Sequence, residues 1–273
     1  MAFKHILAYV DNDAECSARL QYAVDFAALF DARLTGLYAR RLLTVPSYAA
    51  VHIPAPVLAD YEEVSERMAR DAKAAFEQLA GGEGIACEWR LLEGFVPDAI
   101  ARAAQCTDLV VLPQTADNEA DLNETYSTDS VLLKAAAPVL VIPYAGRFQV
   151  PAEHVVIAWN NSREAGRAVR EALPLLHKSQ RITVLSIAEP EREELLGADL
   201  GAYLAHHDLQ VELKQIPAGD CSTADALLSC IADNTGDLLV MGGYGRSRLL
   251  ETVLGGTTRE ILAHMTVPVL MSH

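Results

Sequence analysis

The chain of 273 residues has little of what would place it in several common protein classes. Aromatic residues make up only 6%, and the five cysteines include no Cys-x-x-Cys pair. Scattered thiols in odd number argue against a disulfide framework and a zinc knuckle, and they are typical of a reducing compartment. No run approaches the roughly 18 apolar residues of a membrane-spanning helix, and the first residues lack a signal-peptide pattern. We therefore expect a cytoplasmic protein with no membrane partner.

Positive charge is also scarce. The 22 Lys and Arg residues stand against 37 Asp and Glu residues, for a formal net charge of −15. Duplex nucleic acid is bound largely through Lys and Arg that neutralise phosphates, so this balance argues against a nucleic-acid partner. It does not exclude a nucleotide, because local donors decide binding within a Debye length of roughly 8 Å. The 51% hydrophobic content is enough for a core in two domains of ordinary size.

Recognisable catalytic and metal-binding motifs are missing as well. The sequence has no His-Glu-x-x-His motif, no paired cysteines, and no Ser or Cys nucleophile in a known motif. The adjacent pair His206 and His207 would point in different directions on a helix, which predicts exposed surface instead of a metal site. We expect no catalytic residue and no metal-ligating residue.

Glycine is concentrated in one informative place. An apolar strand-like run ends in the glycines of residues 242–245, a second glycine pair follows at 255–256, and a helix is predicted over 257–264. Glycine lets backbone N–H groups approach an anion closely, and a helix N-terminus adds unpaired donors and a favourable dipole. The spacing is neither that of the dinucleotide fingerprint nor that of the P-loop. It predicts a cradle for a phosphate chain; the alternative is a tight strand-to-helix turn.

The sequence also repeats itself once. Residues 5–11, His-Ile-Leu-Ala-Tyr-Val-Asp, parallel residues 154–160, His-Val-Val-Ile-Ala-Trp-Asn. A conserved order of such segments is the signature of duplicated domains. We expect two equivalent domains, 1–146 and 151–273, joined near 144–151. Further matched segments, in the same order, are 33–37 with 181–185, 107–112 with 236–241, and 137–141 with 267–271.

Each copy is predicted to alternate strands and helices and to end in a short helix and a fifth strand. The strands are continuous apolar runs, as expected for parallel strands covered on both faces. Helical spacing of apolar residues begins at Ser162 in the second copy and extends from Leu58 to Leu79 in the first. We expect a doubly wound α/β sheet in each half. The strands of the second copy are predicted at 154–159, 181–187, 209–215, 237–242 and 267–271.

The spacing Gly242-x2-Gly245-x9-Gly255, with Val267-Pro-Val-Leu-Met271 after it, resembles the nucleotide loop of the universal stress protein family, G-x2-G-x9-G-(S/T). The resemblance covers essentially the whole chain, as a tandem type. It implies five-stranded parallel sheets with the strand order 3-2-1-4-5 and helices on both faces. It also implies an adenine nucleotide (ATP, ADP or AMP, with or without Mg) as ligand. The implied role is regulatory, in the stress response, with at most feeble ATP hydrolysis.

Ligands of such sheets bind at the carboxyl ends of the strands, beside the topological switch point. The end of the first strand of the second copy is therefore expected beside the glycine loop. Two residues depart from the family pattern: Asn160 stands where nucleotide-binding members have Asp, and Gly256 where they have Ser or Thr. The expected nucleotide contacts are Ala158, Trp159, Asn160, Leu185, Met241, Gly242, Gly245, Arg246, Gly255, Gly256 and Thr257.

The first copy keeps Asp11 at the end of its first strand but lacks the glycine loop. Residues 113–129 there contain no glycine and five carboxylates, which would repel a triphosphate. We expect a solvated acidic loop, with a divalent-cation site as the alternative. The nucleotide should accordingly occupy only the second domain. The segment 40–56, with three prolines, is expected to be an irregular surface connection or the cover of a pocket.

The two copies are expected to pack against each other through their last strands, 138–142 and 267–271, as an internal pseudo-dimer. Both copies end on an apolar strand, and a bare edge of that kind favours pairing. A homodimer of the chain is possible in addition. The rival hypothesis for function is a nucleotide-free stress protein that acts through protein contacts or through another small ligand.

Overall fold

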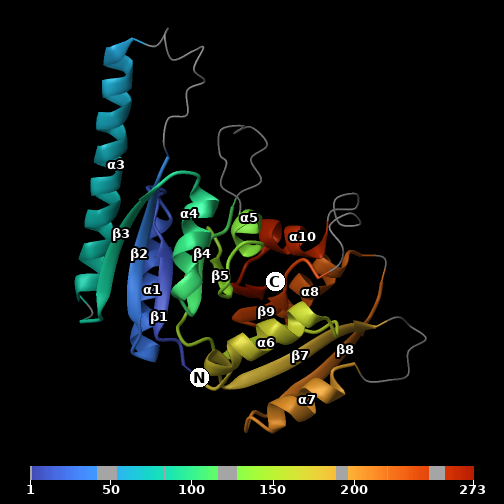
Figure 1. Ribbon diagram of the computed structural model, residues 1–273. Coiled ribbons are helices and arrows are strands. Elements are labelled where there is room, and N and C mark those ends of the chain that lie inside the picture. Colours follow the sequence, from blue (N-terminus) through green and yellow to red (C-terminus); the bar gives the residue numbers. More distant parts are fainter. Residues whose placement is uncertain are drawn as a thin grey trace.

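The computed structural model describes residues 2–41, 54–82, 84–115, 128–188, 196–219, 221–245 and 256–273. Its centre is one ten-stranded sheet with the order β3-β2-β1-β4-β5-β10-β9-β6-β7-β8 (Figure 1). Within each half the strands are parallel and run in the order third, second, first, fourth, fifth. The predicted doubly wound architecture and strand order are confirmed.

The N-terminal half alternates strands and helices as predicted. Its predicted helical stretch from Leu58 to Leu79 is confirmed as part of a longer helix that already includes Ala55 and Pro56 of the supposed connection. The elements are β1 (His5–Tyr9), α1 (Cys16–Phe30), β2 (Arg33–Arg40), α3 (Ala55–Gly82), β3 (Cys87–Glu93), α4 (Val96–Ala103), the 3-10 turn η1 (Ala104–Cys106), β4 (Leu109–Pro113), α5 (Thr128–Leu132) and β5 (Val139–Ile142).

The C-terminal half repeats this order, but its third and fifth strands start later than predicted, the fifth at Val269 instead of residue 267. Its third strand starts at Glu212 instead of residue 209, because Leu209 is buried in the turn that follows the preceding helix and donates its N–H to Leu204 O. The elements are β6 (His154–Ala158), α6 (Arg163–Leu176), β7 (Arg181–Ala188), α7 (Ala198–Ala205), β8 (Glu212–Pro217), α8 (Thr223–Asp233), β9 (Leu238–Gly242), α10 (Thr257–His264) and β10 (Val269–Ser272).

Helices cover both faces of the sheet. One apolar core joins the sheet to α1, α3, α6 and α7, and a second core joins its other face to α4, α5, α8 and α10. The central strands lie between the two cores, so residues such as Ile6, Leu140 and Val155 are fully buried. This explains why the strands appear in the sequence as continuous apolar runs. No helix among the described residues is long and apolar enough to span a bilayer.

The two halves meet through their last strands. β5 and β10 pair antiparallel, with Leu140 opposite Leu270 and Val139 opposite Met271. Each strand thereby covers the apolar edge that the other half would otherwise expose. The predicted pairing of the last strands is confirmed.

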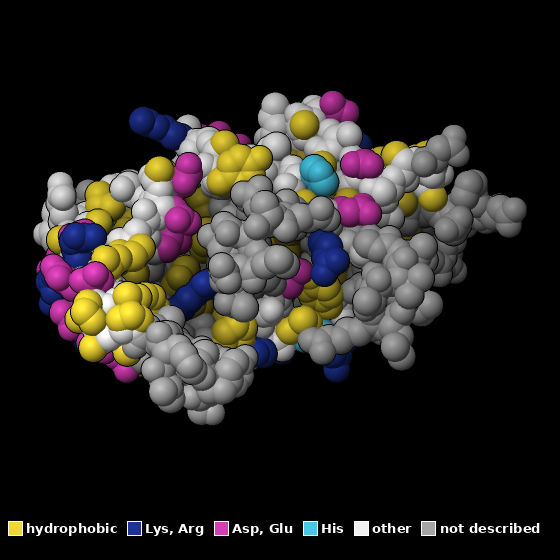
Figure 2. Space-filling view, turned by 90° about the horizontal axis from the view of Figure 1, so that it is seen from above, with side chains coloured by type: hydrophobic (Ala, Val, Ile, Leu, Met, Phe, Trp, Pro, Cys, Tyr) yellow, Lys and Arg dark blue, Asp and Glu magenta, His cyan; other side chains and the backbone are white. Residues whose placement is uncertain are grey.

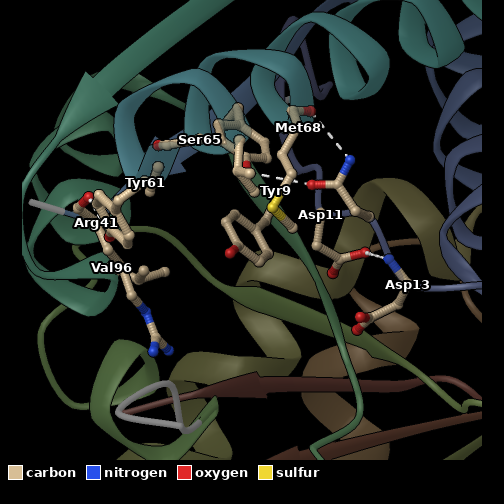
Figure 3. Close-up of a pocket in the computed structure, with 12 residues that line it drawn as sticks. Tyr9, Asp11, Asp13, Arg41, Tyr61, Ser65, Met68 and Val96 are labelled. Carbon is tan, nitrogen blue, oxygen red and sulfur yellow. Dashed lines mark hydrogen bonds between the residues drawn. The ribbon is translucent and has the colours of Figure 1, made fainter. Parts of the chain in front are cut away.

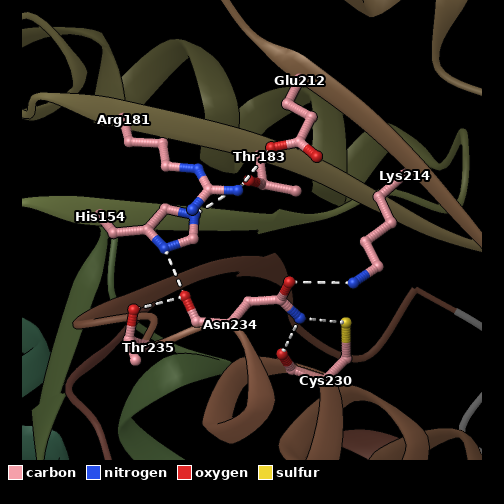
Figure 4. A network of polar contacts seen from close by, with 8 residues as sticks. All are labelled: His154, Arg181, Thr183, Glu212, Lys214, Cys230, Asn234 and Thr235. Carbon is pink, nitrogen blue, oxygen red and sulfur yellow. Dashed lines mark hydrogen bonds and ion pairs between the residues drawn. The ribbon is translucent and has the colours of Figure 1, made fainter.

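A polar latch at the amino ends of the strands shows that the repeat extends to side chains (Figure 4). His154 Nδ1 lies 3.0 Å from Asn234 O, and its Nε2 lies 2.9 Å from Thr183 Oγ1. Asp237 accepts the backbone N–H of His154 at 2.9 Å. This edge is opposite to the one where ligands bind such sheets, so the latch is structural. The N-terminal half has the same contacts, formed by His5, Cys106, Thr35 and Asp108.

Candidate functional site

The C-terminal switch point lies between β6 and β9, because β6 pairs with β7 on one side and with β9 on the other. Ala158 ends β6 and Gly242 ends β9, so the two segments predicted to hold a ligand open at the same edge of the sheet. Asn160 is exposed at this edge, where its Oδ1 accepts the N–H of Ser162 at 3.1 Å. Ser162 caps α6, as predicted, by accepting the N–H of Ala165 at 3.1 Å.

Gly242 is explained by close packing of strand against helix. A Cβ at this position would lie 2.4 Å from the backbone N of Ala165 and 2.7 Å from the carbonyl carbon of Glu164. Any side chain would therefore push β9 away from the first turn of α6. Packing of β9 against α6 thus requires a glycine at position 242 whether or not a ligand binds.

The two ends of the glycine loop come together. Tyr244 adopts a positive φ of 53° and donates its backbone N–H to Thr258 Oγ1 at 3.2 Å. Gly256 is the N-cap of α10, in extended geometry and without a side-chain cap bond, and the helix covers Thr257–His264 as predicted. The N–H groups of the first turn of α10 thus lie at the same edge as Tyr244. Arg246 and Gly255, two of the expected contacts, lie outside the described residues.

Glu164 is a component of this edge that the sequence reasoning missed as a site residue. Its side chain is 8% exposed, and a Cβ on Gly245 would lie 2.8 Å from its Oε2. Arg163 Nη2 lies 2.9 Å from the other carboxylate oxygen. A carboxylate in the first turn of α6 is favoured by the helix dipole. It also means that a phosphate next to Gly245 would meet a negative charge, partly balanced by Arg163.

Three other expected contacts, Leu185, Met241 and Trp159, have side chains packed against neighbouring residues. Leu185 and Met241 have side chains buried in the core, and the carbonyl of Leu185 accepts the N–H of Trp159 at 2.8 Å. The indole of Trp159 packs near Gly166 and Gly197, where added Cβ atoms would lie 3.9 Å and 3.5 Å from it. The side chains of Leu185 and Met241 are therefore not exposed at the edge.

The equivalent edge of the N-terminal half holds a cavity of about 300 Å³ (Figure 3). Asp11, which lines the cavity, forms an ion pair with Arg19, whose Nη2 lies 2.6 Å from Asp11 Oδ2; the side chains of Asp11 and Arg19 are 14% and 5% exposed. Counting from His5 and His154, these two residues correspond to Asn160 and Ala168. The second copy thus has neither the buried cation nor its carboxylate partner.

The acidic stretch of the first copy is only partly described. Residues 116–127 lie outside the described residues, as do residues 42–53 of the proline-containing connection. Asp129 was expected in a solvated loop, and this is wrong. It belongs to α5, is 24% exposed, and lies 3.9 Å from Arg259 of α10 in the other half. Among the residues that the structure describes, no group of three or more His, Cys, Asp or Glu side chains is placed to hold a metal ion.

Comparisons with known proteins agree with the duplicated fold. The model of the universal stress protein family matches residues 2–143 and again 151–273. A universal stress protein from Archaeoglobus fulgidus is similar in structure, with a TM-score of 0.78 and 16% identity over 98% of this chain and 95% of that one. A putative universal stress protein from Pseudomonas aeruginosa has a TM-score of 0.60 and 16% identity, covering 99% of this chain and 93% of that one.

A third solved structure is a universal stress protein in complex with cAMP; it covers 53% of this chain and 100% of that one, with 18% identity and a TM-score of 0.37. No match was found among the curated proteins. The family model covers nearly the whole sequence in two consecutive segments, and both halves have the same strand order. The chain belongs to the universal stress protein family, with two family domains in tandem.

Proposed function

We propose that this protein is a nucleotide-responsive regulatory module of the stress response that binds one adenine nucleotide, in its C-terminal domain (151–273). The observation that carries the proposal is the contact between Tyr244 N–H and Thr258 Oγ1, 3.2 Å long. It brings the strand-end glycines and the start of α10 together beside the end of β6, the arrangement that a phosphate cradle requires. The N-terminal domain (1–146) has no such loop in its sequence.

The roles proposed for the individual residues follow from their positions. The backbone N–H groups of Gly256 and Thr257 would bind phosphate oxygens, since an N-terminal turn without a side-chain cap retains unpaired donors. Asn160 would contact the base or the ribose with its amide, which offers a donor and an acceptor without charge. Arg246 and Gly255 complete the proposed contacts. The proposal is for binding, and it assigns no catalytic residue.

The nucleotide-free hypothesis retains one specific observation in its favour. The carboxylate of Glu164 lies against Gly245, where the family motif would expect a phosphate. Gly256 also lacks the hydroxyl that nucleotide-binding members carry. Both features weaken binding of a triphosphate more than binding of a nucleoside monophosphate, so the phosphate count of the ligand is the property to test.

The experiment compares affinities for ATP, ADP, AMP and cAMP by isothermal titration calorimetry in the wild type and in Gly256→Ser. Gly256 has φ −66° and ψ 150°, which serine adopts without strain. A new hydroxyl bonded to a charged phosphate oxygen contributes about 1.5–3 kcal/mol before ordering costs. We expect tighter binding of ATP than the wild type shows, and little change for AMP. Capping of α10 by serine would instead affect all ligands alike, and by only a few tenths of a kcal/mol.

The matched control is Gly81→Ser, at a site in α3 where a Cβ meets nothing within 4 Å. It should leave every affinity unchanged. Wild-type protein that binds none of the four nucleotides would reject the proposal in favour of the nucleotide-free hypothesis. Substitution of Gly245 by a larger residue is a poor test, because the new side chain would displace the carboxylate of Glu164 whether or not a ligand binds.

A further inference from the structure

The cavity of the N-terminal domain is bounded on one side by an exposed apolar helix face. Tyr61, Val64 and Met68 of α3 line the cavity and are 37%, 42% and 41% exposed. Their helical spacing continues into Ala72 and Phe76, which are buried against the sheet. The same face of α3 is thus covered in its C-terminal part and open beside the cavity, where the helix extends beyond the strand ends (Figure 1). Exposed apolar groups gathered at a cavity mark a binding surface.

Hydrogen bonds fix the walls of this cavity. Asn12, which follows β1, donates its amide to Met68 O at 3.0 Å and accepts the hydroxyl of Tyr38 at 3.1 Å. Tyr61 donates its hydroxyl to Arg41 O at 3.3 Å. Burial first, and then Asp11 and Tyr61, raise the pKa of Tyr38, so its phenol is neutral at physiological pH. The helix, the end of β1 and the end of β2 are therefore tied together without a ligand.

Charges of opposite sign line the two ends of the cavity. Asp11 and Asp13 lie at one end and Arg41 at the other, with Tyr9 and Met68 between them (Figure 3). Looking down on the upper edge of the molecule, Figure 2 shows hydrophobic side chains grouped next to acidic and basic ones over the N-terminal half. The surface around the cavity is thus mixed, and the sequence offers no glycine cradle for phosphates on this side.

We propose that this cavity binds a small dipolar molecule with an ammonium group at one end, a carboxylate at the other and an aromatic or aliphatic middle. The ammonium would lie at Asp11 and Asp13 and against the tyrosine rings, which attract cations. The carboxylate would bind Arg41, whose guanidinium matches carboxylate geometry. The middle would cover the open face of α3. A volume of about 300 Å³ is at the small end of ligand pockets, which suits a molecule of this size.

The probe is 4-(aminomethyl)benzoate, which carries both charges across one aromatic ring. Benzylamine and benzoate, each with a single charge, and AMP are the comparison ligands. Binding is followed by NMR of protein labelled with ¹³C at the methionine methyl groups. The sequence has five methionines. Met68 lines the N-terminal cavity, and Met241 directly precedes Gly242 at the end of β9 in the other domain. The two resonances therefore separate this inference from the nucleotide proposal, and either can fail without the other.

We expect the dipolar probe to shift the Met68 resonance, and to bind about threefold to tenfold more tightly than benzylamine or benzoate, the contribution of one charged contact. Arg41→Gln should remove the advantage over benzylamine, and Asp13→Asn should reduce the advantage over benzoate. Arg70→Gln and Asp31→Asn, at exposed positions outside the cavity lining, are the matched controls and should change neither ratio.

Three outcomes would overturn the inference. The first is equal affinity for the dipolar probe and both singly charged ligands. The second is a shift of the Met68 resonance by AMP at lower concentration than by the dipolar probe. The third is no shift of Met68 by the probe in wild-type protein at millimolar concentration. Since Arg41 and Asp13 are exposed, their variants are expected to fold, which far-UV circular dichroism checks.

Discussion

Equivalent residues in the two halves differ in charge, and this is the clearest difference between the carboxyl-end edges of their sheets. The Asp11–Arg19 ion pair of the first half corresponds to the uncharged Asn160 and Ala168 of the second. The second half instead holds the carboxylate of Glu164 against Gly245. Each edge thus contains one largely buried carboxylate, but at a different place along the edge.

The nearly buried carboxylate gives a prediction at the residue scale. Glu164→Gln removes a negative charge beside the proposed phosphate site and should raise the affinity for ATP by about 1 kcal/mol, roughly fivefold, with little change for adenosine. Arg163→Gln should weaken ATP binding, because Arg163 partly balances the same carboxylate. Calorimetric titration of both variants measures these changes.

The matched control for this pair is Glu15→Gln. Glu15 is the counterpart of Glu164 in the first half, counted from the two strand-starting histidines, and it is exposed. It should leave ATP affinity unchanged. Equal ATP affinity in the wild type and in Glu164→Gln would show that no phosphate lies near Gly245.

The short helices α5 and α10 occupy equivalent places at the joint between the halves and make related contacts across it. Gln114, which follows β4, donates its amide to Leu262 O at 2.8 Å and Ala263 O at 3.0 Å, near the end of α10. Gly243, which follows β9, lies against Leu132 of α5: a Cβ there would be 2.7 Å from a Leu132 methyl group. The amide of Gln114 thus donates to carbonyl oxygens of α10, whereas Gly243 leaves room for the apolar side chain of Leu132 in α5.

Gln114 therefore gives a prediction at the element scale. Its side chain is buried, and it also accepts the N–H of Tyr144 at 3.2 Å. Gln114→Ala leaves the carbonyls at the end of α10 and this N–H without their partner. We expect the free energy of unfolding to fall by about 2 kcal/mol. Gln78→Ala, on the exposed side of α3, is the control and should stay within about 0.5 kcal/mol. Urea unfolding measures both; a Gln114→Ala variant as stable as the control would contradict the proposed role of these bonds.

The whole molecule is built around one sheet that both halves share. Arg167 of α6 adds to the β5–β10 pairing by donating to Ala136 O of the first half and to His273 O at the end of the chain, both at 2.8 Å. The outer strands β3 and β8 carry ion pairs with their inner neighbours, Arg33–Glu88 and Arg181–Glu212. Charged edge strands discourage pairing with another molecule. The structure thus closes its apolar edges internally and leaves charged ones outside.

A shared sheet predicts that the two halves unfold together, although two-domain chains often unfold in steps. The protein has two tryptophans, Trp89 in the first half and Trp159 in the second. In Trp159→Phe the remaining fluorescence reports the first half, and in Trp89→Phe the second. We expect the urea midpoint by fluorescence to coincide with that by far-UV circular dichroism in both variants. A fluorescence midpoint clearly below the circular dichroism midpoint in either variant would indicate that one half unfolds alone.

The duplication, the α/β class, the order of elements and the pairing of the last strands were all predicted from the sequence, because they depend on local apolar patterns repeated twice. Helix α10 was predicted residue by residue, from the glycines that precede it. The start of β8 was predicted three residues too early. Leu209 is apolar, as a strand residue would be, but it is buried in a turn through contacts that the local sequence does not specify. Asp129 was misplaced for the same reason: its partner, Arg259, is distant in sequence.

For the candidate site, the sequence by itself determined which positions to consider, because the strand ends and the glycine spacing can be recognised locally. Only the tertiary structure decided what surrounds those positions. It packed Gly242 against α6, set Glu164 beside Gly245, buried the side chains of Leu185 and Met241, and opened a cavity beneath α3 in the other half. Each of these depends on how segments far apart in the chain meet. A local pattern specifies an element and its exposed end, while the charge and shape of a site arise from the neighbours that folding brings to it.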